Sequence, residues 1–327
     1  MDTLVKHVTL KSGELAELRR VEMPDAPRRD ALVRFYMHKG EPWVWQISCA
    51  LGGCAKGLEA LFFVAEIQGS LVGALAIEKA AWAGILSHVF VDPQHRRKGI
   101  ASHLLEIAIE EFRCRAGRLL TLSTGYDSPA YHIYSQFGFA SIVERSGIMM
   151  ISNVENDHET YDPARPVKVT QATWRHWPLA AALFARVDGR CVRNVAYGVF
   201  GPGGLEGPFL YALKASMEGK GQMVVLESDS APEAVVGLAT LLPDSRWPHS
   251  VWLLDLFTHR DFENRAKDLI DGLDLSSRKI QCHVDADAAP LVGALRSSNF
   301  RVEGTMKAQV IHQDRPLDVL VMGRVVA

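Results

Sequence analysis

One stretch decides how the first half of the chain folds: Phe90-Val-Asp-Pro-Gln-His-Arg-Arg-Lys-Gly-Ile-Ala-Ser-His-Leu-Leu105. An apolar strand ends in a basic turn that contains Gly99, and an amphipathic helix follows the turn. The first amides of a helix have no intrahelical partner and lie at the positive end of its dipole. This order of elements predicts an anion-binding site, with a surface turn that carries a solvated basic run as the alternative.

The residues of the turn suit a phosphate group. Small Gly99 and Ala101 allow an anion to approach the backbone, and positive charge comes from Arg96, Arg97 and Lys98. The apolar residues downstream fall on one helical face, namely Ile100, Leu104, Ile107, Ala108 and Phe112. The spacing is not that of the P-loop, because Gly-x-x-x-x-Gly-Lys-(Ser/Thr) is missing, and two glycines of the dinucleotide-binding fingerprint are also missing.

A second stretch, Asp127-Ser-Pro-Ala-Tyr-His-Ile-Tyr-Ser-Gln-Phe-Gly-Phe139, is typical of a short helix. Asp127 or Ser128 can cap its start, Pro129 suits the first turn, and Gly138 can end it in a left-handed conformation. Tyr134 lies on the apolar stripe of this helix. A tyrosine in such a position is more often a core residue with its hydroxyl at the surface.

Both stretches resemble one family. Arg96-x-x-Gly99-x-Ala101 resembles the (Gln/Arg)-x-x-Gly-x-(Gly/Ala) signature of the GNAT N-acetyltransferase superfamily, as does the preceding Val-Asp-Pro. The second stretch resembles the family's Asn-x-x-Ala-x-x-Leu-Tyr-x-x-x-Gly-Phe pattern, with Asp127 in place of Asn and Ile133 in place of Leu. The resemblance implies that the first motif cradles the pyrophosphate of acetyl-coenzyme A (acetyl-CoA) and that Tyr134 protonates the departing thiolate.

The resemblance also implies the other coenzyme-binding residues. The strand before the turn would bind the pantetheine arm through its backbone, and one of its amides would polarise the thioester carbonyl. Ser128 and Tyr131 could contact the coenzyme, with core packing as the alternative for Tyr131. The predicted set is Val89, Phe90, Val91, Arg96, Arg97, Lys98, Gly99, Ile100, Ala101, Ser102, Ser128 and Tyr131.

The motifs do not define a general base. His88 is the candidate, because an unperturbed histidine titrates at about pH 6.5. Strand alternation places it on the face opposite to Val89 and Val91 unless a β-bulge intervenes, so a buried core histidine, with a water chain as base, is the alternative. Candidates for an acceptor pocket lie in the preceding helical stretch: Tyr36, Glu41, Trp43 and Trp45.

Composition limits the class of protein. The 327 residues suit two domains, and a hydrophobic content of 48% with a formal net charge of −2 describes a globular chain. This charge gives no reason to expect nucleic acid or an anionic membrane as a partner. Five cysteines without C-x-x-C spacing predict reduced thiols, a cytoplasmic location and no metal site. The N-terminus lacks a signal-peptide core, and the apolar runs are too short for a membrane span.

We expect an α+β fold with two GNAT-like domains, each a central mixed β-sheet flanked by helices. Residues 1–153 form the first domain, residues 154–166 are a predicted linker, and residues 167–327 repeat the order of elements. In the repeat, one helix is predicted over Asp261–Leu273. The acidic run Asp261-Phe-Glu-Asn-Arg-Ala266 replaces the phosphate-binding turn, and Leu295 stands where the first half has Tyr134. The second domain is therefore expected to be degenerate, with a structural or substrate-shaping role.

The sequence as a whole predicts an acetyl-CoA-dependent N-acetyltransferase, a monomer or homodimer that acts on a primary amine of a small molecule or peptide. The amine would attack the thioester directly. The rival prediction is an acyl-CoA-binding regulatory module without turnover, because the strand before the first motif lacks the glutamate that many relatives carry. Transfer to a hydroxyl group, and transfer of a longer acyl chain, stay open.

Overall fold

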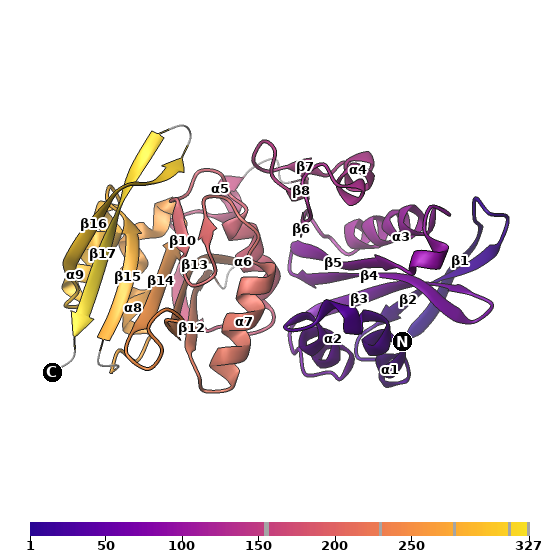
Figure 1. Cartoon of the computed structure of the whole chain (residues 1–327), viewed down its shortest axis with the longest axis horizontal. Coiled ribbons are helices and arrows are strands. Elements are labelled where there is room, and N and C mark those ends of the chain that lie inside the picture. Colours follow the sequence, from indigo (N-terminus) through magenta and orange to yellow (C-terminus); the bar gives the residue numbers. More distant parts are fainter. Residues whose placement is uncertain (154–156, 229–230, 277–278, 313–314, 326–327) are drawn as a thin grey trace. The chain divides into compact units, whose positions relative to one another are not determined.

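The chain is described by a computed structural model that covers residues 1–153, 157–228, 231–276, 279–312 and 315–325. It forms two compact units, Met1–Val154 and Glu155–Ala327 (Figure 1). Each unit contains one large mixed β-sheet with helices on its faces, which confirms the predicted α+β fold class. Residues 154–156 of the predicted linker lie outside the described residues. No helix within the described ranges is long and apolar enough to cross a membrane.

The first unit contains an eight-stranded sheet in the order β1-β2-β3-β4-β5-β6-β8-β7, in which only β5 and β6 pair in parallel. The strands are β1 (Asp2–Thr9), β2 (Leu15–Glu22), β3 (Glu59–Ile67), β4 (Ser70–Ala80), β5 (Ala83–Val91), β6 (Leu119–Ser123), β7 (Ala140–Ser141) and β8 (Ile148–Ser152). The helices are α1 (Ala26–Tyr36), α2 (Trp43–Leu51), α3 (Ile100–Cys114) and α4 (Pro129–Gln136), with short 3-10 helices η1 (Met37–Lys39) and η2 (Pro93–His95).

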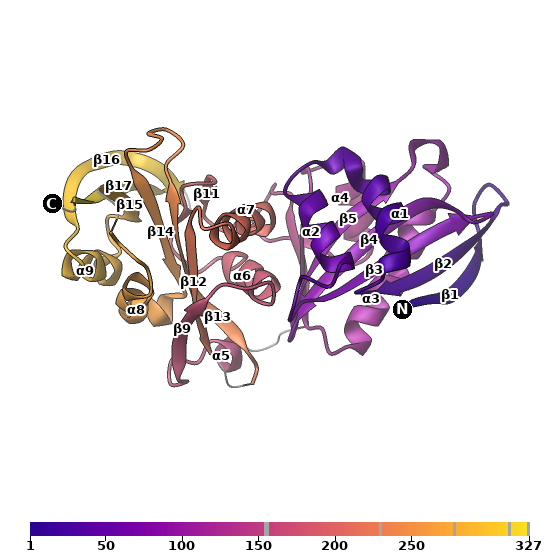
Figure 2. The same cartoon turned by 90° about the horizontal axis from the view of Figure 1, so that it is seen from below.

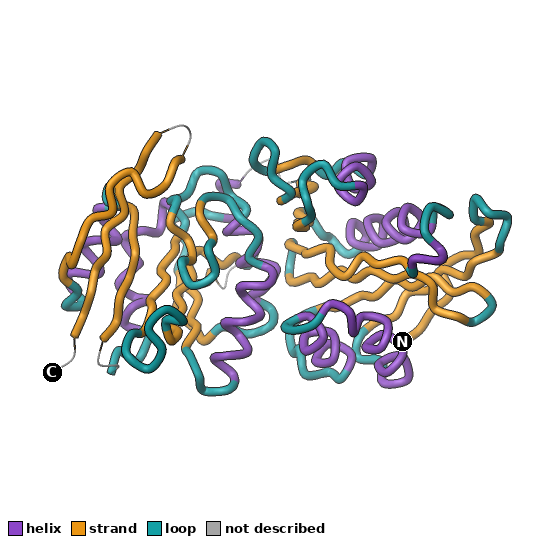
Figure 3. The backbone as a smooth tube through the Cα atoms, in the orientation of Figure 1, coloured by secondary structure: helices purple, strands orange, loops and turns teal. Residues whose placement is uncertain are grey.

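Helices cover both faces of this sheet, with α1 and α2 on one face and α3 on the other (Figures 1, 2 and 3). Strand β3 shows why, because its alternate side chains enter two separate hydrophobic clusters. Leu61 and Phe63 pack with the apolar stripe of α3, whereas Phe62 and Val64 pack with α1 and α2. The middle of the sheet is therefore buried on both sides.

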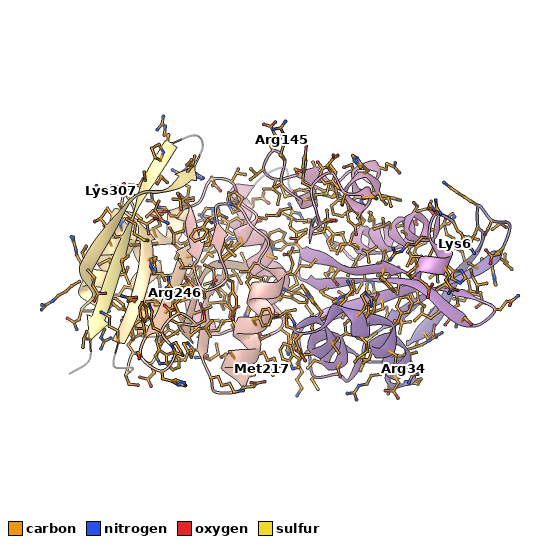
Figure 4. All side chains as sticks on the ribbon, in the orientation of Figure 1. Lys6, Arg34, Arg145, Met217, Arg246 and Lys307 are labelled. Atoms are coloured by element: carbon orange, nitrogen blue, oxygen red, sulfur yellow. The ribbon has the colours of Figure 1, made fainter. Side chains whose placement is uncertain are left out.

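Strand β1 is an element that the sequence pattern does not predict, because most of its side chains are exposed or only half-buried. It pairs with β2 along its length, and Lys6 (labelled in Figure 4) forms an ion pair with Glu106 of α3 at 2.7 Å. The loop between β1 and β2 carries Lys11, whose backbone N–H donates to the carbonyl of Lys98 at 3.2 Å. This contact brings the hairpin loop to the basic turn.

The helix α4 begins and ends as predicted. Ser128 is its N-cap, and the Ser128 hydroxyl accepts a hydrogen bond from the backbone N–H of Tyr131 at 3.1 Å. Gly138 adopts a left-handed conformation (φ +90°) just after the helix. Asp127, the other candidate cap, instead forms an exposed ion pair with His132 at 2.9 Å.

Helix α3 approaches the sheet closely at Gly73 of β4. A Cβ atom at Gly73 would lie 2.7 Å from Cγ2 of Ile100, the first residue of α3. Ile100 is itself buried among the core residues on this face. The missing side chain at Gly73 therefore sets the distance between the start of α3 and the strands beneath it.

The second unit contains a seven-stranded sheet in the order β16-β17-β15-β14-β13-β12-β9. Its strands are β9 (Val167–Gln171), β12 (Gln222–Ser228), β13 (Ala234–Pro243), β14 (Trp252–Thr258), β15 (Lys279–Asp285), β16 (Arg301–His312) and β17 (Arg315–Val325). The helices are α5 (Asp157–Thr160), α6 (His176–Phe184), α7 (Glu206–Met217), α8 (Ala266–Asp271) and α9 (Ala289–Ser297), with the 3-10 helix η3 (Arg260–Arg265). Read from β9, this strand order matches that of the first unit from β2 to β7, including one parallel pair, β14 with β15.

Two sequence-based expectations differ from the structure of the second unit. Within the predicted linker, residues 157–160 form α5, and Tyr161 is buried with its ring stacked on that of His259 at 4.6 Å. The single helix predicted over Asp261–Leu273 is wrong, because Arg260–Arg265 form the tighter η3. Glu263 of η3 is buried and pairs with Arg190 at 2.6 Å, so its acidic side chain is turned inward rather than along a helix surface.

A short second sheet distinguishes this unit, made of β10 (Val192–Asn194) and β11 (Val199–Phe200). The backbone amides beside β10 are bound by two buried carboxylates, Asp255 in the middle of β14 and Asp285 at the end of β15. Asp285 accepts from Cys191 at 2.7 Å and Val192 at 3.2 Å, and Asp255 accepts from Val195 at 2.6 Å and Ala196 at 3.1 Å. Residues 191–196 therefore bridge the two strands beyond the point where their parallel pairing ends.

We expect Gly73→Ala to lower the free energy of unfolding by about 1–3 kcal/mol, because the added methyl group overpacks the contact between β4 and Ile100. Chemical denaturation followed by circular dichroism measures the change. Gly125→Ala is the matched control, since a Cβ at Gly125 would make only ordinary contacts with Ser128 at 3.6 Å or more. Equal stability of Gly73→Ala and the unmodified protein would contradict the close approach described above.

Candidate functional site

The first unit contains a pocket of about 600 Å³ between the end of β5, the start of α3 and the helix α4. The residues that line it are Lys11, Val89, Phe90, Val91, His95, Arg96, Arg97, Gly99, Ile100, Ala101, Ser102, Ser128, Pro129, Ala130, Ile133, Tyr134 and Gln136. These lining residues include three Lys or Arg side chains and no Asp or Glu. The pocket is therefore suited to an anionic ligand with an apolar portion.

A β-bulge at His88 shapes the floor of the pocket. His88 has a left-handed backbone conformation (φ +57°), and the register between β4 and β5 shifts by one residue between Ala74↔Phe90 and Ala76↔Ser87. On its other edge β5 pairs with β6 only over Ala83–Ile85. Beyond Ile85 the described part of β6 does not pair with β5, so this edge faces the pocket with its backbone groups available to a ligand.

The start of α3 has the geometry of an anion site. Gly99 is the N-cap with φ +92°, and no side chain caps this end of the helix. The N–H of His103 makes the first intrahelical bond, to the Gly99 carbonyl at 3.1 Å, so the preceding amides of the first turn have no intrahelical partner. Glycine is required at position 99 by its conformation rather than by crowding, because a Cβ would meet only atoms at 3.9 Å.

The basic residues of the turn do not all face the pocket. Arg96 and Arg97 line it, and the Arg96 guanidinium lies over the Phe90 ring at 6.0 Å while its Nε donates to the Val91 carbonyl at 3.2 Å. Lys98 does not line it, because its ammonium group pairs with Glu14 at 2.6 Å and thereby lowers the pKa of that carboxyl. Lys11 of the β1–β2 loop is a lining cation that the motifs do not reveal.

Two tyrosines of α4 have different environments. Tyr134 lines the pocket and is 7% exposed, and burial raises the pKa of its phenol to about 12, so it keeps its proton at neutral pH. Tyr131 does not line the pocket. Its hydroxyl bonds to that of Ser141 at 2.9 Å, and its ring packs against the hydrophobic core. The structure thus places Tyr134, but not Tyr131, beside the ends of β5 and α3.

His88 also lies outside the pocket, with its side chain on the face of the sheet that α1 and α2 cover. Its ring lies 5.4 Å from that of Tyr36, 5.6 Å from Trp43 and 6.2 Å from Phe62. Burial, with a smaller effect of the Lys39 charge, lowers the pKa of His88 well below its usual range. His88 is therefore neutral at pH 7 and has a free lone pair on one ring nitrogen.

A buried polar cluster surrounds His88. Its Nε2 lies 2.7 Å from Oε1 of Gln46, and Nε2 of Gln46 donates to Oε1 of Glu78 at 2.9 Å. The Ser87 hydroxyl donates to the same Glu78 oxygen at 3.2 Å. Burial raises the pKa of the Glu78 carboxyl to about 8 in spite of these hydrogen bonds. Gln46 and Glu78 carry no motif signal, since each is a polar residue in a mostly apolar element.

The four acceptor-pocket candidates are not equivalent. Tyr36 is fully buried in the core between α1, α2 and the sheet, and its hydroxyl has no hydrogen-bond partner among the described residues. Glu41 is exposed, and Trp43 and Trp45 are both half-buried on α2. Tyr36 and Trp43 both have their rings near that of His88, Trp43 in an edge-on arrangement. Of these two, Trp43 is the partly exposed one, since Tyr36 is fully buried.

Comparisons with known proteins find a similarity in this region. Residues 59–141 match the family model described as acetyltransferase (GNAT) domain. The matched segment includes the bulge, the basic turn, the start of α3 and the helix α4. An uncharacterized N-acetyltransferase of Methanocaldococcus jannaschii is 33% identical over 114 residues, which are 32% of this chain and 48% of that protein. The match thus spans about half the length of this relative.

Some solved acetyltransferase structures are also similar to part of this chain. A ribosomal-protein-alanine N-acetyltransferase from Brucella melitensis is 18% identical, with 48% of this chain and 99% of that chain covered and a TM-score of 0.39. A phosphinothricin acetyltransferase from Sinorhizobium meliloti, solved in complex with acetyl-CoA, is 16% identical with 49% and 89% coverage and a TM-score of 0.40. A putative acetyltransferase from Salmonella typhimurium with its cofactor acetyl-CoA is 13% identical with 50% and 95% coverage and a TM-score of 0.40.

The buried carboxyl of Glu78 predicts a pH-dependent stability. Its pKa is raised from an ordinary value of 4.5 to about 8 in the folded protein, so the unfolded chain loses this proton at lower pH than the folded chain. The unmodified protein should therefore lose stability relative to Glu78→Gln as pH rises from about 4.5 to about 8, by several kcal/mol in total. Denaturant unfolding of both proteins across this range measures the difference, and a pH-independent difference would contradict the assignment.

Proposed function

We propose that the first unit, whose residues 59–141 carry the GNAT acetyltransferase match, is an acetyl-CoA-dependent N-acetyltransferase that acts on a primary amine of a small molecule or peptide. The observation that carries the proposal is a helix start without a capping side chain, at Gly99, which opens into a pocket with Tyr134 on its far wall. A pyrophosphate at one end and a thioester at the other would satisfy both features. The match to the M. jannaschii N-acetyltransferase supports the same activity.

The residues present fit acetyl-CoA, which would supply an acetyl group activated as a thioester. The amides at the start of α3, with Arg96, Arg97 and Lys11, would bind its phosphate groups. The unpaired edge of β5 at Val89–Val91 would bind the amide-containing pantetheine arm in the manner of an added strand. A backbone N–H of the same edge would polarise the carbonyl to be attacked.

Tyr134 is the proposed general acid. The amine lone pair forms a C–N bond at the carbonyl carbon, the C–S bond breaks, and the sulfur leaves as a thiolate that must be protonated. A phenol with a pKa of about 12 is fully protonated at neutral pH and donates a hydrogen bond to the developing thiolate. Because a thiol titrates at about pH 8.5, full transfer of the phenolic proton to the thiolate is uphill, and a tyrosinate left behind would recover its proton from solvent.

His88 is the proposed general base. Its imidazole is neutral, and one ring nitrogen would accept the proton that the amine loses. The acceptor would approach along the half-buried ring of Trp43 rather than through the coenzyme pocket. Amine and thioester would then meet at the bulge, since His88 and Val89 are consecutive residues whose side chains lie on opposite faces of β5.

An acyl-CoA-binding module without turnover is the second candidate function. One observation favours it: the His88 side chain is almost completely buried, and no carboxylate lines the pocket. Such a module would bind acetyl-CoA as tightly as the enzyme but would release no free thiol in the presence of amines. Turnover experiments therefore separate the two functions.

The second unit, with its Glu263–Arg190 pair at the corresponding turn, is proposed to be a GNAT-like domain that no longer binds the coenzyme. This assignment rests on the shared strand order and on the buried acidic residue where the first unit has a glycine-capped helix. The first domain would then comprise residues 1–153 and the second residues 167–327. The cytoplasmic location and the monomeric or homodimeric state remain predictions from the sequence.

Acetyl-CoA should bind the intact chain with measurable heat in isothermal titration, and Gly99→Asp should weaken binding by at least about 100-fold. The added carboxylate would repel a phosphate and would strain the left-handed backbone. Gly69→Asp is the matched control, because Gly69 has a similar positive φ of +76° in the open turn between β3 and β4. Absence of heat with the unmodified protein would rule out both candidate functions.

Tyr134→Phe should lower kcat by about 100-fold or more while leaving the Kd for acetyl-CoA nearly unchanged, since only the acidic proton is removed. Tyr131→Phe is the control, because it removes a hydroxyl that bonds only within the fold. Release of free thiol with a panel of amines measures turnover. If Tyr134→Phe were as active as Tyr131→Phe, Tyr134 would not be the general acid.

A further inference from the structure

The buried polar cluster on the α1–α2 face of the sheet has more order than a core histidine requires. It joins three elements: Gln46 from α2, Glu78 from β4, and Ser87 with His88 from β5. Each of the four side chains is buried, and three hydrogen bonds connect His88 to Gln46, Gln46 to Glu78, and Glu78 to Ser87. Burying four polar groups is costly unless they bond to one another in a fixed pattern.

The direction of these bonds determines the proton positions on His88. Oε1 of Gln46 is an acceptor only, so the His88 Nε2 that lies 2.7 Å from it must carry the hydrogen. The neutral imidazole then has its lone pair on Nδ1. Gln46 stays in this orientation because its Nε2 donates to Oε1 of Glu78, an oxygen that also accepts from Ser87.

The ring of His88 is also fixed in space. Phe62 stacks parallel to it at an interplanar angle of 5°, Tyr36 lies tilted at 5.4 Å, and Trp43 lies edge-on at 5.6 Å. These contacts and the bond to Gln46 together hold a residue whose backbone has the uncommon positive φ. The charged or titratable groups around the ring are Glu78, Tyr36 and Lys39.

We propose that Gln46 and Glu78 are positioning residues that hold His88 as the Nε2–H tautomer, so that Nδ1 is the nitrogen that receives the proton of the acceptor amine. The proposal rests on the proposed function, because it specifies the base of that same reaction. Gln46 acts directly on the ring. Glu78 acts through Gln46, as the acceptor that prevents the side-chain amide from reversing.

The tautomer is measured without substrate, from the ring ¹⁵N shifts of His88 in long-range ¹H–¹⁵N correlation spectra at pH 7, assigned with His88→Gln. The unmodified protein should show a protonated Nε2 and an unprotonated Nδ1. Gln46→Met, which fills the same space without hydrogen bonds, should show a mixture of both tautomers. Ser87→Ala is the matched control, since it removes a buried bond of the same cluster and leaves the His88–Gln46 bond in place.

Turnover provides a second readout that a merely structural role would not affect. Gln46→Met should lower kcat by about 10- to 100-fold with an unchanged KM for acetyl-CoA, the size of loss typical for a group that orients a functional histidine. Glu78→Gln keeps an acceptor oxygen for Gln46 and should retain most of the activity, whereas Glu78→Leu should resemble Gln46→Met.

Two results would overturn the inference. The first is a protonated Nδ1 in the unmodified protein, which would mean that the Gln46 amide is reversed and accepts from a protonated Glu78. The second is full kcat in Gln46→Met, even if the unmodified protein shows the expected Nε2–H tautomer. Failure of every amine to release free thiol would instead refute the proposed enzyme, and the spectra decide the tautomer independently of that outcome.

Discussion

The pocket of the first unit depends on a single extra residue in β5. At the bulge, β5 has one residue more than β4, and His88 takes up the difference with a left-handed backbone. The bulge turns the end of the strand so that its far edge is not paired with β6 beyond Ile85. Without it, β5 and β6 could continue as an ordinary parallel pair whose backbone groups bond to each other. A cleft with available amides would then have no place to form.

The side chain of His88 explains why such a conformation is stable. A positive φ at a non-glycine residue is unfavourable unless the surroundings fix it, and here three aromatic rings and Gln46 do so. The same residue therefore separates two environments. The backbone after it faces the pocket at the start of α3, while its imidazole faces the α1–α2 side. A reaction between two substrates that enter from opposite faces needs such a separation.

The sequence predicted the parts of the site that depend on local chemistry. The glycine-capped start of α3 and the serine-capped α4 follow from residue types and short spacing, and the structure has both. Strand alternation places His88 on the face opposite to Val89 and Val91, as in the structure, but the bulge at His88 has no signal in the sequence. Strand β1 has too little buried surface for a periodic signal. The sequence therefore did not indicate that Lys11, in the loop after this strand, lines the pocket. Gln46 and Glu78 meet only through tertiary packing of α2 on β4.

The two carboxylates that bind residues 191–196 limit which substitutions the second unit can accept in this region. Asp255 and Asp285 each accept hydrogen bonds from two backbone amides of this segment, so loss of either carboxylate removes an acceptor from both donors. A change at one carboxylate would therefore require a compensating change in the bridging segment. The two aspartates and this short segment thus constrain one another, although they are far apart along the chain.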